Sequence, residues 1–447
     1  MASPELLVHH HAPSPAQAEC LSAFGALRKG CHDADALELG EGCNRFPPSP
    51  DLAGYLSGLL DRLIRDGTLS SYGDPRRGGT RQAMAELLGP HLGLVLEPRD
   101  VFFTRGGTEA ISLTLAHLAH SGHSLTLPLP SYYAFDQCAV RWGASVTGYY
   151  RHDGQHHTTG APPGTSSCLV EVLPNGVTGA RHALPQLPAP DFTVVDVPFQ
   201  TGAAGAQPAD ILRERVRSLD LRTSALILTA SKDLSLPGLR AAVIVTKNKA
   251  LLGHLSRDHF ERLAMSGNPV GEIALLFYVS VLLLLDAPDD HLGKLVQIAQ
   301  DCVRRAHLPA LPDEEIHHRA RAHLTAMGNR FRHNAEALTD PASPLRQIEG
   351  LAPAAGYSAF AELHPPQADF LRWVSDCGQR GLRLNPTVVH GGTNAAWNTL
   401  YPGKQLLRIN LSEEPADFRH GLALLKQLAE RPGRSPGMST TPHGPPR

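Results

Sequence analysis

The chain has 447 residues, and its 41 lysine and arginine side chains nearly balance its 43 aspartate and glutamate side chains. This length exceeds what one hydrophobic core fills comfortably and predicts two domains. The balanced charge, with no basic stripe, argues against a nucleic-acid partner. The 7 cysteines are scattered without a CxxC pair, which is typical of reduced intracellular thiols. The amino terminus shows no export signal, so we expect a cytoplasmic protein.

The two ends of the chain differ in composition from the rest. Residues 1–15 and 431–447 are rich in Pro, Ser, Gly and His, and we expect both segments to be poorly ordered. Residues 16–30 have the pattern of a helix, and residues 37–42 form a short extended segment. Prolines near residue 50 then precede leucines at helical spacing.

Strands and helices alternate through the middle of the chain. Short apolar runs with recurring β-branched residues are separated by connections that are mostly long enough for a helix or a crossover loop. This alternation predicts a largely parallel sheet covered by helices on both faces. The predicted strands are Ser124–Leu127, Ser145–Tyr149, Cys168–Val172, Phe192–Val195, Ala225–Leu228 and Ala241–Val245.

One segment, residues 272–288, is apolar enough to suggest a membrane helix. Its uncharged part, Ile273–Leu285, is shorter than the ~20 residues that a membrane span needs. Acidic side chains bound it on both sides. We therefore expect a buried core helix and no membrane partner.

The last third of the chain is predicted to form a second unit. A long helix at about 313–338 leads into further strands and helices at about 345–430. The expected fold class is α/β: a large domain with a three-layer, mostly parallel sheet and a smaller α+β domain. The expected boundaries are an amino-terminal arm with part of the small domain at 1–50, the large domain at 51–335, the small domain at 336–430 and a mobile tail at 431–447.

Ligands of open α/β sheets bind at the carboxyl ends of the strands, so the residues there are candidates for a binding site. Gly106, Gly107 and Thr108 open a helix after a strand, where backbone N–H groups and the helix dipole suit a phosphate. A tight turn explains such glycines equally well. Tyr132 and Tyr133 follow the next strand and are either cofactor-stacking rings or ordinary strand-edge aromatics.

Two further strand ends carry charged side chains. Asp196 ends an apolar strand, and a buried carboxylate there requires a cationic or hydrogen-bonding partner. Lys232 follows another strand in "LTASKDLSLPGLR", with Thr229 before it and Arg240 after it. Desolvation and a nearby cation would lower the pKa of this lysine and make it a nucleophile toward an aldehyde. A phosphate site, a carboxylate, an aromatic ring and a Schiff-base lysine together suit pyridoxal 5'-phosphate (PLP).

Over roughly residues 35–428, the sequence resembles the fold-type I PLP enzymes of the aminotransferase class I/II family, which includes aspartate aminotransferase. The motifs are "SYGDPRRGGTRQAMAELL", "GGTEA", "PSYYAF", "TASKDLSLPGLR" and "LLRINLSEE". The resemblance implies a Schiff base on Lys232, an aspartate partner for the pyridine nitrogen and an arginine for the substrate carboxylate. The residues that carry these roles by resemblance are Gly106, Gly107, Thr108, Thr229 and Arg240 for the phosphate, Tyr132 for ring stacking, Asp196 for the ring nitrogen and Arg408 for the carboxylate.

The chain departs from the family at two positions. The family usually has Asn-Pro-Thr-Gly, whose asparagine contacts the phenolic oxygen of the cofactor, whereas this chain has Gly176 there and Asn175 one residue earlier. Phe199 stands where the family has a tyrosine bonded to the same oxygen. Asn175 is the candidate replacement. The histidine-rich segment 151–160, which matches nothing in the family, is predicted to be a loop that faces either solvent or substrate.

These features predict a PLP-dependent transferase that acts on an α-amino acid, with transamination as the expected reaction. Lys232 would hold the cofactor and move the α-proton, and Asp196 would keep the ring nitrogen protonated. The alternative is a non-transaminating PLP enzyme of secondary metabolism, acting on an amino acid or an S-adenosylmethionine-like substrate by γ-elimination or replacement, cyclisation, carbon–carbon bond formation or oxidation. The altered contacts to the phenolic oxygen motivate this alternative.

Hypotheses from other classes are weaker. A regulator that keeps the fold without catalysis would need a DNA-binding module, and only about 35 non-basic residues precede the matched region. A metal hydrolase built on His317, His318 and His323 lacks a zinc motif with a carboxylate, so no metal is expected. The resemblance also implies a homodimer in which Tyr72 reaches the cofactor phosphate of the neighbouring subunit.

Overall fold

The computed structural model describes most of the chain. The described residues are residue 22 and the ranges 36–70, 77–152, 155–159, 166–181, 189–201, 208–263, 268–285, 287–348, 350–390 and 401–430. Tyr72, the two terminal segments and, apart from residue 22, the predicted helix at 16–30 lie outside these residues.

The centre of the molecule is an eight-stranded sheet in the order β2-β9-β8-β7-β6-β3-β4-β5. Neighbouring strands from β8 to β4 are parallel, whereas β9 runs antiparallel to both β8 and β2, and β5 runs antiparallel to β4. The mostly parallel sheet predicted from the sequence is confirmed. Its strands are β2 (Val101–Thr104), β3 (Ser124–Pro128), β4 (Val146–His152), β5 (Gln155–Thr159), β6 (Ser167–Val172), β7 (Phe192–Val197), β8 (Ser224–Thr229) and β9 (Ala242–Thr246).

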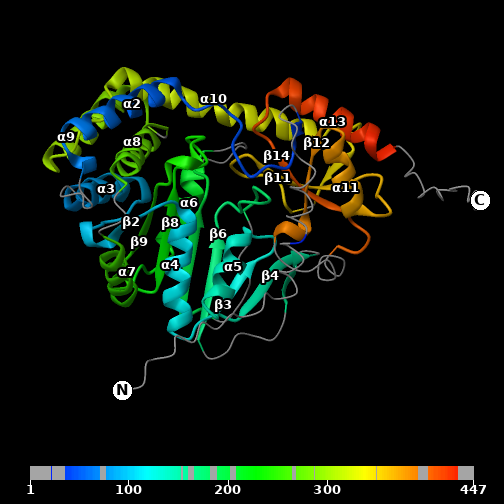
Figure 1. Cartoon of the computed structure of the whole chain (residues 1–447), viewed down its shortest axis with the longest axis horizontal. Helices are drawn as coiled ribbons and strands as arrows, with labels where there is room; N and C mark the ends of the chain where they lie inside the picture. Colours follow the sequence, from blue (N-terminus) through cyan, green and yellow to red (C-terminus); the bar gives the residue numbers. More distant parts are fainter. Residues whose placement is uncertain are drawn as a thin grey trace, which may run out of the picture.

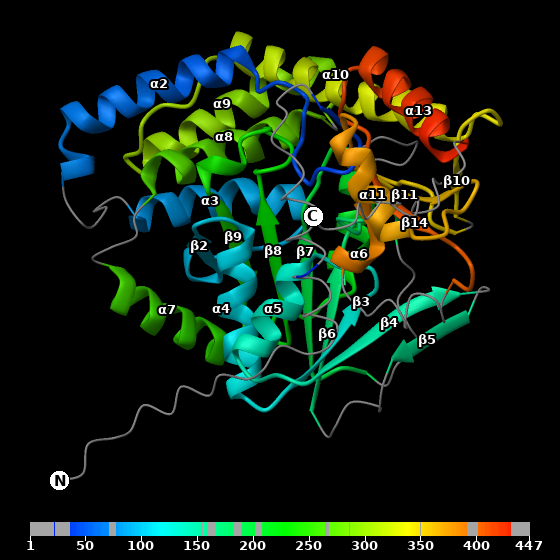
Figure 2. The same cartoon turned by 45° about the vertical axis from the view of Figure 1, so that its right-hand side comes forward.

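Helices cover both faces of this sheet. Successive side chains of a strand point to opposite faces, and accordingly Val243 and Val245 pack in one apolar cluster while Ile244 packs in the other. The Ile244 face carries α4 (Gly107–His120), α5 (Tyr133–Arg141) and α7 (Lys249–Leu263), which lie together in Figure 2. The opposite face carries α2 (Pro50–Arg65), α3 (Arg77–Leu92), α6 (Pro208–Arg217), α8 (Pro269–Leu285), α9 (Leu292–Arg305) and α10 (Glu314–Leu338).

The apolar segment singled out in the sequence is the core helix α8. Nearly all of its side chains are buried, including Phe277 and Tyr278, which are both 1% exposed. Within the described ranges, no helix has the length and apolar character needed to cross a membrane. The prediction of a buried helix is confirmed.

A smaller antiparallel sheet lies beside the large one, in the order β10-β11-β14-β13 (Figure 1). The long helix α10 extends along the molecule from α8 and α9 to α13. Near the amino terminus, β1 pairs in parallel with β12, more than three hundred residues away in sequence. These elements are β1 (Leu37–Glu38), β10 (Leu345–Gln347), β11 (Ser358–Leu363), β12 (Leu382–Arg383), β13 (Asn385–Pro386), β14 (Leu406–Asn410), α11 (Phe370–Gln379) and α13 (Pro415–Glu430).

Local signals explain where two of the long helices begin. The Ser49 hydroxyl accepts a hydrogen bond from the Leu52 N–H at 3.5 Å, and Pro50 occupies the first position of α2. Asp313 caps α10 in the same way by accepting from Ile316 N–H at 2.9 Å. Short 3-10 turns complete the description: η1 (Thr68–Ser70), η2 (Pro98–Asp100), η3 (Pro237–Leu239), η4 (Asp289–His291) and η5 (Thr387–His390).

The histidine-rich segment differs from its prediction. Residues 155–159, expected to belong to a loop, form β5 and pair antiparallel with β4. The sequence Gln-His-His-Thr-Thr lacks the apolar residues that mark a strand, and the segment takes strand geometry by pairing with the edge of the sheet.

Candidate active site

A cavity of about 550 Å³ lies at the carboxyl ends of β6, β7 and β8. Its walls come from the large sheet and the helices that follow its strands, from the small sheet, from α11 and from the segment from Glu38 to Cys43. It brings together most of the residues predicted from the sequence, namely Gly107, Thr108, Tyr132, Asp196, Thr229, Lys232, Arg240 and Arg408. Because β9 runs antiparallel to β8, its amino end and the preceding Arg240 lie at the same edge as Lys232.

The Lys232 amine is held inside the cavity by the amino-terminal segment. Its Nζ donates a hydrogen bond to the backbone oxygen of Gly42 at 2.7 Å, and the Tyr357 hydroxyl donates to the same oxygen at 2.6 Å. Burial, with the positive charges of Arg408 and Arg240, lowers the pKa of Lys232 to about 8. A substantial fraction of this amine is therefore neutral near physiological pH and can act as a nucleophile.

Asp196 is the buried acid of the cavity. Burial raises its pKa to about 7, and the positive charge of Lys232 lowers it in part. Within the described part of the chain, no group donates a hydrogen bond to this carboxylate or pairs with it as an ion. A buried carboxylate in this state favours a cationic ligand, and a protonated pyridine nitrogen would fit that requirement.

The amino end of α4 meets Arg240. Gly106 has φ of 84°, and a Cβ atom at this position would lie only 2.8 Å from the Arg240 Cζ. The N–H groups of Glu109 and Ala110 donate to the Gly106 oxygen at 3.2 and 3.3 Å, whereas those of Gly107 and Thr108, at the start of α4, have no acceptor among the described residues. Among the described residues the Arg240 guanidinium has no carboxylate partner. A helix amino end facing a free guanidinium fits a phosphate group.

Tyr132 lies beside this anion site. Its hydroxyl is 3.5 Å from the Thr108 hydroxyl, and its ring meets the ring of Tyr133 edge to face at 4.6 Å. Thr229 lines the cavity next to Gly107, and its hydroxyl donates to Ser231 Oγ at 3.0 Å. Both predicted residues are therefore at the cavity.

Arg408 extends from the middle of the small sheet into the opposite wall. Its Nε and Nη2 donate to the hydroxyl of Ser358 at 3.3 and 2.9 Å. A Cβ atom on Gly42 would lie 3.0 Å from Nη1, so the glycine keeps space open beside the guanidinium. No described carboxylate forms an ion pair with Arg408, although burial lowers its pKa. A carboxylate ligand would supply the missing negative charge.

Two predicted residues within the described part of the chain, Gly106 and Asn175, do not line the cavity itself. Asn175 is buried, with its side-chain oxygen accepting from Val177 N–H at 2.9 Å and Thr178 N–H at 3.1 Å, and its amide donating to Pro130 O at 2.8 Å. It does not line the cavity, whereas Gly176 and Phe199 do. Tyr72 falls outside the described residues.

Several residues of the cavity wall were not predicted, because no local sequence pattern marks them. Glu38, Glu41 and Cys43 line it because β1 pairs with β12. Burial and the nearby charge of Glu41 raise the pKa of Glu38 to about 7, and an Arg383 Nη1 lies 3.7 Å from its Oε2. His390 is also part of the wall.

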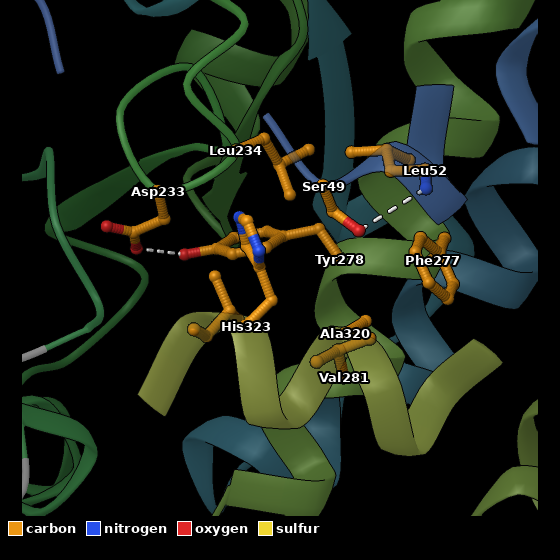
Figure 3. Close-up of a pocket in the computed structure, with 10 residues that line it drawn as sticks. Ser49, Leu52, Asp233, Leu234, Phe277, Tyr278, Val281, Ala320 and His323 are labelled. Carbon is orange, nitrogen blue, oxygen red and sulfur yellow. Dashed lines mark hydrogen bonds between the residues drawn. The ribbon is translucent and has the colours of Figure 1, made fainter. Parts of the chain in front are cut away.

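A buried network behind the lysine fixes its loop. The Asp233 carboxylate accepts from the backbone N–H of Gln200 at 2.8 Å, from the Thr201 hydroxyl at 2.7 Å and from the Tyr278 hydroxyl. Figure 3 shows the Asp233–Tyr278 bond beside a small apolar pocket near Ser49. Three donors on one carboxylate hold the residue next to Lys232 in place.

The histidines considered for a metal site have other partners. His317 Nε2 lies 2.9 Å from the Ser280 hydroxyl and Nδ1 lies 2.9 Å from Asp313 O. His323 Nε2 lies 3.1 Å from Pro47 O. The described residues contain no group of three or more His, Cys, Asp or Glu side chains that could hold a metal ion.

Comparison with solved structures identifies the fold. An aspartate aminotransferase double mutant of Thermus thermophilus matches 96% of this chain and 100% of its own, with a TM-score of 0.62 and 15% identity. Tyrosine aminotransferase of Leishmania infantum has a TM-score of 0.64 at 13% identity, covering 94% of this chain and 98% of its own. N-Succinyldiaminopimelate aminotransferase of Mycobacterium tuberculosis has a TM-score of 0.64 at 16% identity, covering 93% and 97%. The chain therefore has the fold of the fold-type I aminotransferases, as the motifs predict.

The sequence comparisons are narrower. No family model matches the chain. A probable aminotransferase of Arabidopsis thaliana, TAT1, is 36% identical over 86 residues, a segment that makes up 19% of this chain and 19% of the relative. The matched part is thus a small fraction of either protein.

Proposed function

We propose that the chain is a PLP-dependent aminotransferase that acts on an α-amino acid. The observation that carries this proposal is the meeting of Lys232 and Asp196 in one cavity with an anion site at Gly106 and Arg240. The aminotransferase fold and the short sequence match to an aminotransferase support it. The donor set fits the cofactor at each end: cationic and N–H groups suit its phosphate, and a buried acid suits its ring nitrogen.

The protein residues divide the work of the reaction. When bound, PLP withdraws electrons from the α-carbon of the substrate. Lys232 would hold the cofactor through its amine and would carry the α-proton as a general base and acid. Asp196 would keep a proton on the ring nitrogen, and Tyr132 would supply an aromatic ring beside it. Thr108, Thr229 and Arg240 would hold the phosphate.

Arg408 is the residue that would orient the substrate. Its guanidinium would grip the α-carboxylate and so fix the α-hydrogen relative to the Lys232 amine. Covering walls from the small sheet and the Glu38–Cys43 segment limit the access of water. We further propose a homodimer in which Tyr72 completes the phosphate site of the partner.

A half-reaction tests transamination directly. The purified protein is loaded with PLP and incubated with a panel of ¹⁵N-labelled amino acids without any acceptor. An aminotransferase transfers the label to the cofactor, which is then recovered as ¹⁵N-pyridoxamine phosphate together with one equivalent of 2-oxo acid. Product formation without transfer of label to the cofactor would contradict transamination, and a Lys232→Ala variant serves as the control.

A further inference from the structure

His390 is a buried side chain of the cavity with no assigned role. It ends the turn η5, and only 4% of its surface is exposed. Its backbone oxygen accepts from the Ser131 N–H at 2.9 Å, next to Tyr132, and the Thr387 hydroxyl ties the same turn to Leu406 O of β14 at 2.9 Å. The residue is therefore fixed between the Tyr132 loop and the strand that carries Arg408.

One ring nitrogen of His390 lacks the partner that a buried polar group requires, as far as the described part of the chain shows. Its Nε2 is buried and has no hydrogen-bond partner among the described residues. Leaving such a group unpaired costs free energy, and buried polar atoms without partners in a cavity wall point to a ligand. Burial, together with the positive charge of Arg408, holds the pKa of His390 well below its usual range. The ring is therefore neutral, with one N–H to donate.

A carboxylate bound at Arg408 would need a hydrogen-bond donor in addition to the guanidinium. Its Nε and Nη2 already donate to Ser358 Oγ, so the conventional two-bond edge of the guanidinium is in use. The Tyr357 hydroxyl is a further side-chain partner of the guanidinium. Only part of the donor capacity of Nη1 and Nη2 therefore remains, next to the space left by Gly42. A carboxylate has about four lone-pair sites, so these two donors leave acceptor capacity unfilled.

We propose that His390 is a specificity-determining residue that donates a hydrogen bond to the substrate carboxylate bound by Arg408. The inference rests on the proposed function, because that function puts a carboxylate at Arg408. It goes further by assigning the second donor. It also predicts that two side chains on different elements, His390 of η5 and Arg408 of β14, let the cavity distinguish an amino acid from the amine that lacks its carboxylate.

Two stable conjugates separate this role from a structural one. N-(5'-phosphopyridoxyl)-L-alanine and N-(5'-phosphopyridoxyl)ethylamine differ only in the α-carboxylate, and both are measured by calorimetry on the protein freed of cofactor. The ratio of their affinities reports the carboxylate contacts alone. Wild-type protein should favour the alanine conjugate, and His390→Ala should reduce that ratio about tenfold, the usual effect of one hydrogen bond to a charged group.

Matched variants sharpen the test. His390→Gln keeps a donor and should preserve most of the ratio, whereas Arg408→Ala should abolish it. In the Arg408→Ala background, His390→Ala should have no further effect on the ratio. His317→Ala removes a buried histidine away from the cavity and should leave the ratio unchanged even if it weakens the fold.

The outcomes distinguish the two proposals. If neither conjugate binds, the proposed function fails and this inference falls with it. If the ratio collapses in Arg408→Ala but is unchanged in His390→Ala, the inference is overturned while the proposed function stands. A His390→Ala variant that weakens both conjugates equally would also overturn it, because a structural role lowers both affinities together.

Discussion

The Lys232 amine donates a hydrogen bond to the backbone oxygen of Gly42 at 2.7 Å, which links the proposed nucleophile to a segment far away in sequence. This contact places the lysine beside the other charged groups of the cavity. A carbonyl acceptor stabilises the protonated amine, but burial and the charge of Arg408 outweigh it and lower the pKa.

The first prediction concerns the pH dependence of cofactor attachment. Only the neutral amine attacks an aldehyde, so the rate of PLP attachment should rise with pH and level off above about 8. The measurement is the rate of PLP incorporation, trapped with borohydride, in buffers from about pH 6 to about pH 11. A rate that keeps rising toward the ordinary lysine pKa of 10.5 would contradict the lowered pKa.

The second prediction is that Asp196 lowers the stability of the cofactor-free protein. Its pKa is higher in the folded chain than the ordinary 3.8, so the folded state binds the proton more tightly. The resulting cost is absent below pH 3.8 and fully developed above about pH 7. Asp196→Asn should therefore raise the free energy of unfolding at pH 8, by on the order of 3 kcal/mol.

Chemical unfolding at pH 8 and pH 5, without cofactor, measures this effect. The gain should be smaller at the lower pH. The same variant should lose at least about a hundredfold in turnover, since an amide cannot hold the ring nitrogen protonated. Equal stability of variant and wild type at pH 8 would argue against an unpaired buried charge.

The third prediction is that the Asp233→Asn substitution destabilises the protein, whereas Asp196→Asn stabilises it. Asp233 also has a raised pKa, about 6, caused by burial, but it accepts hydrogen bonds from Tyr278, Thr201 and Gln200. Asp233→Asn replaces one acceptor oxygen with a donor and should lower the free energy of unfolding at pH 7 by about 2–4 kcal/mol. Tyr278→Phe removes one donor and should cost less. Unchanged stability in Asp233→Asn would refute the network.

The fourth prediction tests the anion site with a matched pair of glycines. Gly106 and Gly122 both have positive φ, 84° and 79°, so alanine is strained at either position. The ψ of 166° puts Gly106 in a region that is essentially restricted to glycine, so alanine there costs on the order of 1–3 kcal/mol. Only at Gly106 does the new Cβ meet the Arg240 guanidinium, whereas nothing lies within 4 Å at Gly122. Gly106→Ala should weaken PLP binding at least about tenfold, equivalent to ~1.4 kcal/mol.

Gly122→Ala should bind PLP as wild type does. Fluorescence titration of cofactor-free protein gives both affinities. Equal affinities in the two variants would remove the argument for a phosphate at this helix end.

The residues that follow the strands of the large sheet could be predicted from the sequence. Asp196 comes directly after an apolar run and Lys232 a few residues after another. The carboxyl ends of parallel strands meet at one edge of a sheet, so both side chains are expected at that edge. The covering of both faces and the burial of α8 also follow from apolar patterning.

Contacts between distant segments could not be predicted in this way. Glu38 reaches the cavity because Leu37 pairs with Leu382, a register that no local pattern encodes. Asn175 was expected at the cofactor from its place in a motif, but the N–H groups of Val177 and Thr178 hold its side chain in a local turn. No sequence pattern distinguishes His390 from the other histidines, because it reaches the cavity through a backbone hydrogen bond between its turn and Ser131.

The most direct test of the central claim is the position of the covalent cofactor bond. Protein incubated with PLP, reduced with borohydride and digested should yield a single phosphopyridoxyl peptide, with the adduct on Lys232, and Lys232→Ala should yield none. An adduct on another lysine, or a wild-type protein that takes up no PLP, would contradict the account.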